Sequence, residues 1–218
     1  MTRLACISDL HGQRVPPLPD DIDVVIVAGD CTARDTPADW RAFAEWFKGL
    51  DAKHKILVPG NHDGGLLKRD IMMMLRADPA LIYLKNSGTC IDDINFWGFP
   101  YTPTFGDWHF MADEEEMKMH VSMIPDFINV LISHGPAWGC LDDIPRRRHV
   151  GCKQLAERIC YLPDLKAHIF GHIHECGGKT REIRREDGSG DGSAYTAYNV
   201  AHCNRDYVPT NGWRVIEL

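Results

Sequence analysis

The sequence contains no apolar run of 18 residues, so it predicts no membrane-spanning helix and no membrane partner. It has no N-terminal apolar segment with a cleavage site and no Asn-x-Ser/Thr glycosylation acceptor. Basic residues are fewer than acidic ones. The sequence has 24 Lys and Arg and 31 Asp and Glu, which gives a formal net charge of −7. This balance argues against a protein that coats long nucleic acid. A small anionic substrate stays compatible, since a local site can oppose the net charge.

The eight cysteines include no Cys-x-x-Cys pair, which removes the zinc-ribbon and thioredoxin-like interpretations. Several lie in apolar stretches, as Cys6 does. We therefore expect reduced, mostly buried thiols in a cytoplasmic protein.

The chain is long enough for one domain over residues 1–218, and its 44% apolar content is sufficient for a core. Short apolar runs rich in β-branched residues predict strands at 4–8, 24–28, 56–58, 81–84, 96–99, 127–132, 167–170, 195–200 and 213–216. The early runs are continuous, as in strands that are covered on both faces. Strands alternate with helices in the first half and dominate the end, which predicts a layered α/β (α+β) domain.

Helical spacing predicts helices after Thr36-Pro37 and over residues 66–75 and 150–162. Thr36 is the expected N-cap, with Pro37 at the first helical position. The acidic run at residues 113–116 is expected to form a solvated first helical turn. Residues 187–193, rich in Gly, Asp and Ser, predict a hairpin tip.

Five polar motifs each follow a predicted strand. They are Asp9-Leu10-His11, Gly29-Asp30, Gly60-Asn61-His62-Asp63, Ser133-His134-Gly135-Pro136 and Gly171-His172-Ile173-His174. In an open α/β sheet the loops after the strands gather into one crevice, so the five motifs are expected to converge. Two of them separate a pair of polar side chains by one residue, which in extended backbone places both on the same side.

The polar residues of these motifs have the composition of a metal site. Carboxylate, imidazole and amide oxygen suit Mn²⁺, Fe or Zn²⁺ without a thiolate. Seven ligands exceed what one tetrahedral ion takes from a protein, but two ions about 3.5–4 Å apart accommodate them if one carboxylate bridges. The seven candidates are Asp9, His11, Asp30, Asn61, His134, His172 and His174.

The order of the motifs resembles the calcineurin-like metallophosphoesterase family, whose pattern is Asp-x-His, Gly-Asp, Gly-Asn-His-Asp/Glu, His and Gly-His-x-His. Within it the chain is most similar to the small fetal-brain 239 (metallophosphoesterase-domain-containing) phosphodiesterase group, through Gly98-Phe99-Pro100-Tyr101-Thr102-Pro103 and a tail with Asn199-Val200-Ala201 and Pro209-Thr210-Asn211. Mammalian members of that group can carry Gly at the first His of the last pair, whereas His172 is present here. The resemblance implies a four-layer αββα sandwich of two mixed sheets flanked by helices.

The resemblance also implies roles for individual residues. One ion would bind Asp9, His11, Asp30 and His174, and the other would bind Asp30, Asn61, His134 and His172. His62 would act as a general acid or charge stabiliser at the leaving group, and Asp63 would tune His62. The implied cofactors are two divalent metal ions, with manganese first and iron or zinc as alternatives.

The function implied is that of a phosphodiesterase for small phosphodiesters, cyclic nucleotides among them, in which a metal-bridging hydroxide attacks phosphorus. A metal-dependent nuclease for short or single-stranded nucleic acid is an alternative, indicated by the arginines at 146–148, which follow the His134 loop closely. The basic stretch at 181–185 also favours it, but Glu182 and Glu186 make solvated surface the better interpretation there. A non-catalytic interaction scaffold is a third.

Six aromatic residues between 97 and 110 are open to interpretation as a nucleobase platform, a dimer contact or core: Trp97, Phe99, Tyr101, Phe105, Trp108 and Phe110. Substrate-binding residues and the oligomeric state stay unassigned.

Overall fold

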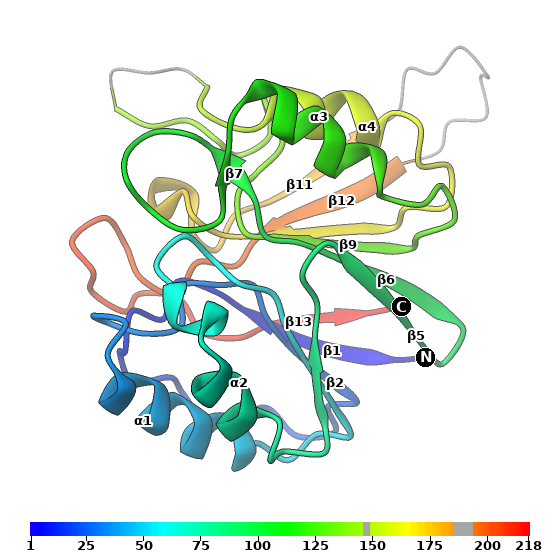
Figure 1. Cartoon of the computed structure of the whole chain (residues 1–218). Helices are drawn as coiled ribbons and strands as arrows, with labels where there is room; N and C mark the ends of the chain where they lie inside the picture. Colours follow the sequence, from blue (N-terminus) through cyan, green and yellow to red (C-terminus); the bar gives the residue numbers. More distant parts are fainter. Residues whose placement is uncertain (146–148, 185–193) are drawn as a thin grey trace.

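Two β-sheets pack face to face, and a pair of helices covers the outer face of each sheet (Figure 1). The computed structural model describes residues 1–145, 149–184 and 194–218. The arginines at 146–148 and the predicted hairpin tip at 187–193 lie outside these residues, as does the last arginine of the basic stretch at 181–185. The four-layer sandwich of mixed sheets that the sequence predicts is confirmed.

The first sheet has the strand order β13-β1-β2-β3-β4. Strands β1 to β4 run parallel, whereas β13 pairs antiparallel with β1 at the edge. The strands are β1 (Arg3–Ile7), β2 (Val24–Val27), β3 (His54–Leu57), β4 (Leu81–Tyr83) and β13 (Arg214–Glu217). Helices α1 (Pro37–Lys48) and α2 (Arg69–Leu75) lie on its outer face, and a short 3₁₀ turn, η1 (Gly64–Leu67), precedes α2 (Figure 1).

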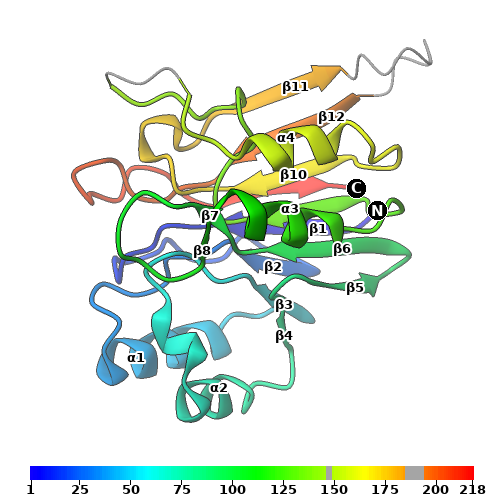
Figure 2. The same ribbon diagram turned by 45° about the horizontal axis from the view of Figure 1, so that its top comes forward.

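The second sheet has the order β11-β12-β10-β9-β6-β5. Its four central strands are parallel, and β11 and β5 are antiparallel edge strands. The strands are β5 (Ser87–Ile91), β6 (Ile94–Phe99), β9 (Val130–Ser133), β10 (Ala167–Phe170), β11 (Thr180–Arg184) and β12 (Ala194–Asn199). Helices α3 (Glu114–Ser122) and α4 (Lys153–Ile159) cover it, the short strands β7 (Thr102–Pro103) and β8 (Met111–Ala112) pair beside it, and a 3₁₀ turn, η2 (His174–Cys176), follows β10 (Figure 2).

Alternation along the strands divides the core into layers. In β1, Leu4 and Cys6 pack between the two sheets, whereas Ala5 and Ile7 pack under the helices. Because both faces of a central strand are buried, most positions in it are apolar. This is why the early strands read as continuous apolar runs in the sequence.

Helix α1 begins where the sequence predicts. The Thr36 side chain accepts a hydrogen bond from the Asp39 N–H, and the Asp39 carboxylate accepts one from the Thr36 N–H. This capping box satisfies two backbone donors that a helix start leaves free. The buried face of the helix presents Trp40, Phe43 and Phe47 to the first sheet.

Other predicted bounds are wrong by a few residues. The strand predicted at 127–132 is β9 (Val130–Ser133), and the helix predicted at 150–162 is the shorter α4. The helix predicted at 66–75 divides into η1 and α2. The edge strands β5 and β11 carry no continuous apolar run, since one of their faces is largely exposed, and periodicity therefore does not predict them.

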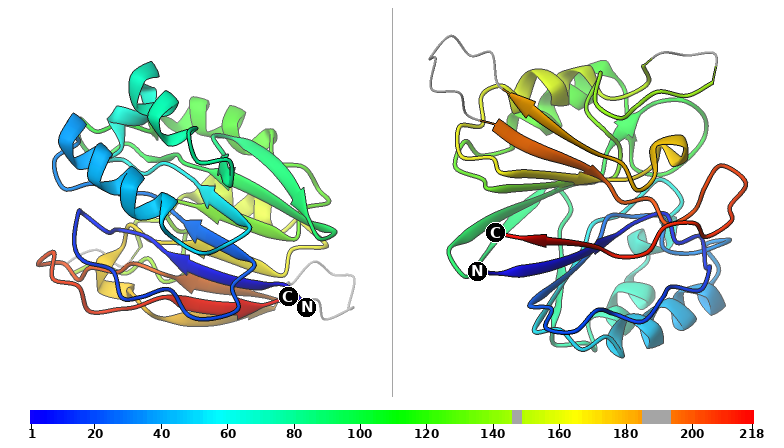
Figure 3. Two further views of the ribbon diagram at one scale, coloured as in Figure 1. Left: turned by 90° about the horizontal axis from the view of Figure 1, so that it is seen from below. Right: turned by 180° about the vertical axis from the view of Figure 1, so that it is seen from behind.

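The parallel strands of both sheets point the same way, so their loops gather at one end of the molecule. The N- and C-termini lie together at the opposite end (Figure 3). Among the described residues, no helix has the length and apolar character needed to cross a bilayer. All eight cysteines are free, and six of them are buried, as the sequence predicts.

Candidate metal centre

The five motifs meet at the end of the sandwich where the parallel strands finish. Asp9 and His11 follow β1, Asp30 follows β2, and Asn61 follows β3, all from the first sheet. His134 follows β9 and the His172/His174 pair follows β10, from the second sheet. The predicted convergence is therefore confirmed, and the site lies across both sheets.

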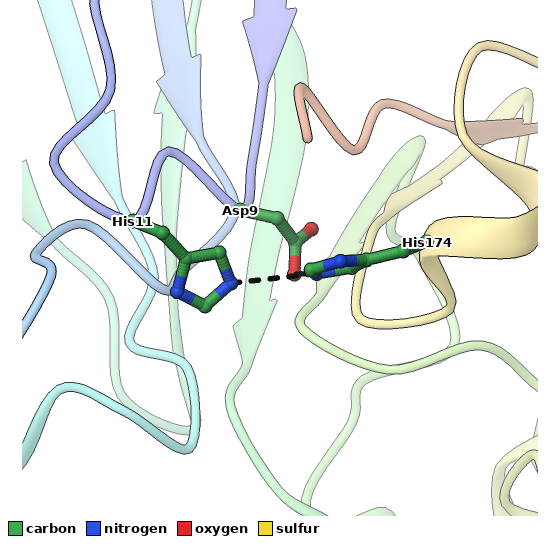
Figure 4. Close-up of side chains that lie close together, drawn as sticks. All are labelled: Asp9, His11 and His174. Carbon is green, nitrogen blue, oxygen red and sulfur yellow. Dashed lines mark hydrogen bonds and ion pairs between the residues drawn. The ribbon is translucent and has the colours of Figure 1, made fainter. Parts of the chain in front are cut away.

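One group of candidate ligands contains Asp9, His11 and His174, whose donor atoms all lie within 4.8 Å of one another. The Nε2 atom of His174 is 3.2 Å from Asp9 Oδ1 and 3.3 Å from His11 Nε2. The two rings and the carboxylate point toward one another (Figure 4). This is one of the two ligand groups that the resemblance implies.

A second group contains Asp30, His134 and His172, again within 4.8 Å. The Nε2 atom of His134 is 3.4 Å from Asp30 Oδ2 and 2.9 Å from Asn61 Oδ1. His134 is completely buried and Asn61 is 2% exposed. The amide oxygen of Asn61 therefore joins this group, in agreement with the second implied ligand set.

Asp30 lies between the two groups. Its Oδ2 atom is 3.7 Å from His11 Nε2 and 3.4 Å from His134 Nε2. Its Oδ1 atom accepts a hydrogen bond of 2.8 Å from the His62 N–H, which fixes the carboxylate. One side chain thus contributes to both groups, as a bridging carboxylate requires.

The donor set fits divalent cations. The Nδ1 atom of His134 donates to the Ala28 carbonyl oxygen, and that of His174 donates to the Asn204 carbonyl oxygen. Both distances are 2.9 Å. In a neutral ring Nε2 then carries a lone pair, and in both residues it faces oxygen acceptors. Such acceptor atoms repel one another unless a proton or a cation lies among them, and a cation meets this requirement for all of them at once.

The charges of the cluster shift its pKa values in opposite directions. Burial disfavours the charged form of His134, but the carboxylates of Asp30 and Asp9 raise its pKa to about 10. Burial likewise opposes ionisation of Asp9, yet the hydrogen bond with His174 and the charge of His134 lower its pKa to about 2. Cation binding at such a site displaces the histidine protons, because imidazole ligates a metal through its lone pair.

Four of the candidate ligands have left-handed backbone. The φ angles are 51° for Asp9, 44° for His11, 56° for Asp30 and 65° for His172. The expectation of extended backbone within the Asp9-Leu10-His11 and His172-Ile173-His174 motifs is therefore wrong, because the chain turns tightly as it leaves β1 and β10. Such conformations cost about 1–3 kcal/mol each and persist where surrounding contacts enforce them, often at functional sites.

Glycines allow the loops to approach closely. A Cβ on Gly29, whose φ is +94°, would lie 2.6 Å from both the Gly60 nitrogen and His134 Nδ1. A Cβ on Gly171 would lie 1.9 Å from Asp9 Oδ2. Any other residue at these positions would push the ligand loops apart.

The two predicted catalytic residues lie in different surroundings. The ring of His62 is partly exposed and packs edge-on against His11, with 4.9 Å between centroids. It is tilted against the ring of Trp108, whose centroid is 4.2 Å away. Asp63 is completely buried, and its carboxylate accepts hydrogen bonds from the N–H groups of Asp30, Cys31 and Gly60.

In the described residues, no hydrogen bond joins the Asp63 carboxylate to His62, so the structure provides no direct contact for the predicted tuning. The bonds of Asp63 instead tie the loop after β2 to the loop after β3. Asp63 therefore positions Asp30 and the Asn61 loop.

The aromatic residues between 97 and 110 divide between core and site. Phe99 and Phe110 are buried in the cores under the helices. Phe105 and Trp108 are about half exposed and lie against His172 and His62. A hollow of about 240 Å³ over the candidate ligands is lined by both of these side chains.

The same hollow is lined by Arg205 and Tyr207, which the sequence analysis does not single out. The ring of Tyr207 stands edge-on to His11 and His174, with centroids 4.7 and 5.5 Å away. Its loop is held by the Asn204 carbonyl, which accepts from His174 Nδ1. Their place in the sequence could have indicated them, because they lie between Asn199-Val200-Ala201 and Pro209-Thr210-Asn211, the two tail segments that resemble the family.

A further cluster, Asp142, Asp143 and His149, also brings three potential ligand atoms together. The completely buried Asp142 carboxylate already accepts from the N–H groups of Gly139, Val150 and Gly151 and bonds His149. These bonds explain the cluster as a loop-organising contact.

Comparison with known proteins agrees with this geometry. The model of the calcineurin-like phosphoesterase family matches residues 2–176. The chain is 30% identical to Metallophosphoesterase domain-containing protein 1 of Homo sapiens over an alignment of 241 positions, which covers all of this chain and 71% of that protein. The protein of the same name from Mus musculus gives the same values.

Solved structures share the fold. The NAD nucleotidase of Haemophilus influenzae superposes with a TM-score of 0.52 at 11% identity, over 99% of this chain and 49% of that one. A putative 5′-nucleotidase from Staphylococcus aureus gives 0.53 at 13% identity, over 99% of this chain and 54% of that one. The likeness in each case is one of architecture. The match to the family model over residues 2–176, a range that contains the motifs of both ligand groups, together with the relative aligned over the whole chain, establishes that this chain belongs to the calcineurin-like phosphoesterase family.

Proposed function

We propose that this protein is a dinuclear-metal-dependent phosphodiesterase that hydrolyses small phosphodiesters, with cyclic nucleotides as the first substrates to test. The observation that carries the proposal is the position of Asp30, whose Oδ2 atom faces histidine nitrogens from both ligand groups. Family membership and the ligand groups support a phosphoester hydrolase that uses divalent metal ions. Manganese is the first candidate, and iron and zinc suit the same donors.

Each ion would have four protein ligands, in the two sets that the sequence analysis gives. Two divalent cations there would supply a water activated for attack at neutral pH and positive charge for the phosphate oxygens. The protein holds the rings of His134 and His174 through backbone carbonyls, so their Nε2 atoms are aimed before a cation arrives. The hollow of about 240 Å³ above them has room for one phosphate and the atoms next to it.

His62 is proposed to donate a proton to the oxygen that leaves phosphorus. Its backbone N–H is anchored on Asp30 Oδ1, and its ring lines the hollow next to His11. A departing alkoxide needs a proton, and an imidazole at hydrogen-bond reach provides one, which contributes about 10²–10⁴-fold to the rate.

The proposed substrate is compact and long nucleic acid is not expected as a partner. The net charge of −7 opposes a long polyanion, whereas two divalent ions would make the site itself locally attractive to one phosphate. A cytoplasmic location is part of the same proposal.

A substrate panel with added Mn²⁺ tests the reaction class. It contains bis-p-nitrophenyl phosphate, p-nitrophenyl phosphate, 2′,3′- and 3′,5′-cyclic nucleotides, and labelled DNA and RNA oligonucleotides. We expect hydrolysis of the diesters without cleavage of the oligonucleotides. Oligonucleotide cleavage at a similar rate would favour the nuclease, and inactivity together with failure to bind metal would favour the interaction scaffold.

The variant His62→Ala tests the proton donor. We expect unchanged metal content and a kcat for cyclic nucleotides that is lower by about 10²–10⁴-fold. His109→Ala is the matched control, because His109 is an exposed histidine on the neighbouring loop that does not line the hollow. Wild-type turnover in His62→Ala would remove His62 from the mechanism.

A further inference from the structure

A larger cavity of about 920 Å³ opens directly beside the candidate metal centre. Its lining residues belong to the loop that joins β7 and β8, to the start of α3 and to the start of α4. The course of these segments can be followed in Figure 2. His172 and Phe105 line both this cavity and the smaller hollow above the ligands, so the two spaces adjoin each other. Its volume is in the range of small-molecule sites.

Two large rings are left half-exposed in its walls. Phe105 is 52% exposed and its ring lies 5.2 Å from the ring of His172, measured between centroids. Trp138 is 41% exposed and carries the Nζ of Lys153 4.7 Å from its ring centroid, which restrains the indole. Ile144 and Val150 add aliphatic surface. Half-exposed aromatic rings around a concave space are typical of sites for flat, largely apolar groups.

The position of His62 decides which part of a phosphodiester would enter this cavity. His62 and Trp108 line the smaller hollow and are not among the residues that line the cavity. A group that leaves next to His62 therefore departs on the side of the small hollow. The cavity beside His172 is left for the ester group that stays on phosphorus.

We propose that the cavity binds this retained ester group and selects an uncharged, flat aromatic group, with Trp138 as the specificity-determining residue. The inference rests on the proposed phosphodiesterase function and adds to it the class of the retained group. Stacking of a flat ring on a restrained aromatic side chain contributes about 1–3 kcal/mol for a nucleobase. A small alkyl group in the same position would leave Trp138 uncovered.

Two diesters with the same leaving group and the same charge isolate this effect. They are phenyl p-nitrophenyl phosphate and methyl p-nitrophenyl phosphate, which release the same phenol and differ only in the retained group. We expect Trp138→Ala to lower kcat/KM about tenfold for the phenyl ester, mainly through KM, and less than twofold for the methyl ester. Comparison of each ester between the two proteins cancels the difference in intrinsic reactivity.

Two further variants separate this role from a fold defect. Trp138→Phe keeps a flat ring and should restore most of the preference for the phenyl ester. Tyr161→Ala removes a ring that is 72% exposed and does not line the cavity, so it should change neither ester. Thermal unfolding of each variant verifies that the fold is intact.

Binding provides a readout that does not depend on turnover. By calorimetry, phenyl phosphate should bind about tenfold more weakly to Trp138→Ala, with methyl phosphate unchanged. An active enzyme in which Trp138→Ala alters both esters alike, or neither, overturns the inference and leaves the proposed function standing. Failure of the wild-type protein to hydrolyse either diester with any of the candidate metals overturns the proposed function itself.

Discussion

Asp30 makes several of the contacts that hold the candidate metal centre together. Its Oδ2 atom faces His11 and His134, its Oδ1 atom accepts from the His62 N–H, and its own N–H donates to Asp63. Because it is 2% exposed, its negative charge is screened little by water. Burial disfavours that charge, but the neighbouring His134 lowers the pKa of Asp30 well below its usual range.

Replacement of Asp30 by alanine should remove a ligand from both cation positions. We expect the wild-type protein to bind two divalent ions per chain and Asp30→Ala to bind neither, as measured by elemental analysis after dialysis against Mn²⁺. Asp143→Ala is the matched control, since Asp143 belongs to the separate Asp142/His149 cluster, and it should keep two ions. Two ions retained by Asp30→Ala would exclude the bridging role.

Residue identity predicts a ligand better than it predicts a positioning role. The seven candidate ligands follow from residue type and from their place after strands, and the structure brings all seven together. Asp63 belongs to the same motif, yet its bonds to three backbone amides depend on how two loops meet. No local sequence pattern encodes how these two loops come together.

At the scale of elements, a buried lysine ties α1, β3 and the turn before β4. Lys55 is 3% exposed, and its Nζ donates to the Lys48 carbonyl at 2.8 Å and to Asp78 Oδ2 at 3.0 Å. An unpaired charge that is buried in this way lowers the stability of the folded protein far more than an unpaired charge at the surface does. The pair therefore fixes where the last turn of α1 meets the first sheet.

The variant Asp78→Ala should lower the free energy of unfolding by about 3–5 kcal/mol, because Lys55 keeps its charge and loses its counterion. The double variant Lys55→Met/Asp78→Leu should recover most of this loss. Chemical denaturation at pH 7 measures both. Lys53→Ala is the control, as Lys53 is 79% exposed in its ion pair with Asp23, and it should change the free energy by less than about 1 kcal/mol. A loss below 1 kcal/mol in Asp78→Ala would contradict the argument.

Elements differ in how much of them local sequence predicts. The capping box at Thr36 and the aromatic face of α1 are local, so the start of that helix is predictable. The edge strand β11 has a mostly exposed, charged sequence and becomes a strand because β12 offers it backbone partners. Edge strands therefore depend on the sheet that they join.

At the scale of the whole molecule, the buried centre of the second sheet contains one histidine that does not face the metal centre. His168, in β10, is completely buried and lies 2.7 Å from the Ser133 hydroxyl, which donates to the Gly135 carbonyl. Burial lowers the pKa of His168 to about 3. The folded protein therefore keeps this ring neutral, whereas the unfolded chain binds a proton near pH 6.5.

This difference makes stability depend on pH with a defined sign. Above about pH 6.5, His168 makes its full contribution to the free energy of unfolding. Below that pH the contribution falls by about 1.4 kcal/mol per pH unit, because the unfolded chain binds a proton that the folded protein does not bind. His168→Gln removes that titration, so its loss of unfolding free energy between pH 7 and pH 5 should be smaller than that of the wild-type protein by about 2 kcal/mol. Urea denaturation at the two pH values, in a chelator so that metal binding does not contribute, measures the difference. Equal losses in the two proteins would show that His168 titrates normally.

The sequence by itself determined the family, the layered α/β architecture and the candidate ligands, because each is written in short-range patterns of residue type and spacing. Only the tertiary structure decided that Asp63 bonds to backbone amides and that Tyr207 and Trp138 border the site. The physical reason is distance along the chain. His11 and His174 are 163 residues apart, and their 3.3 Å separation is set by the packing of two sheets, which no local pattern encodes.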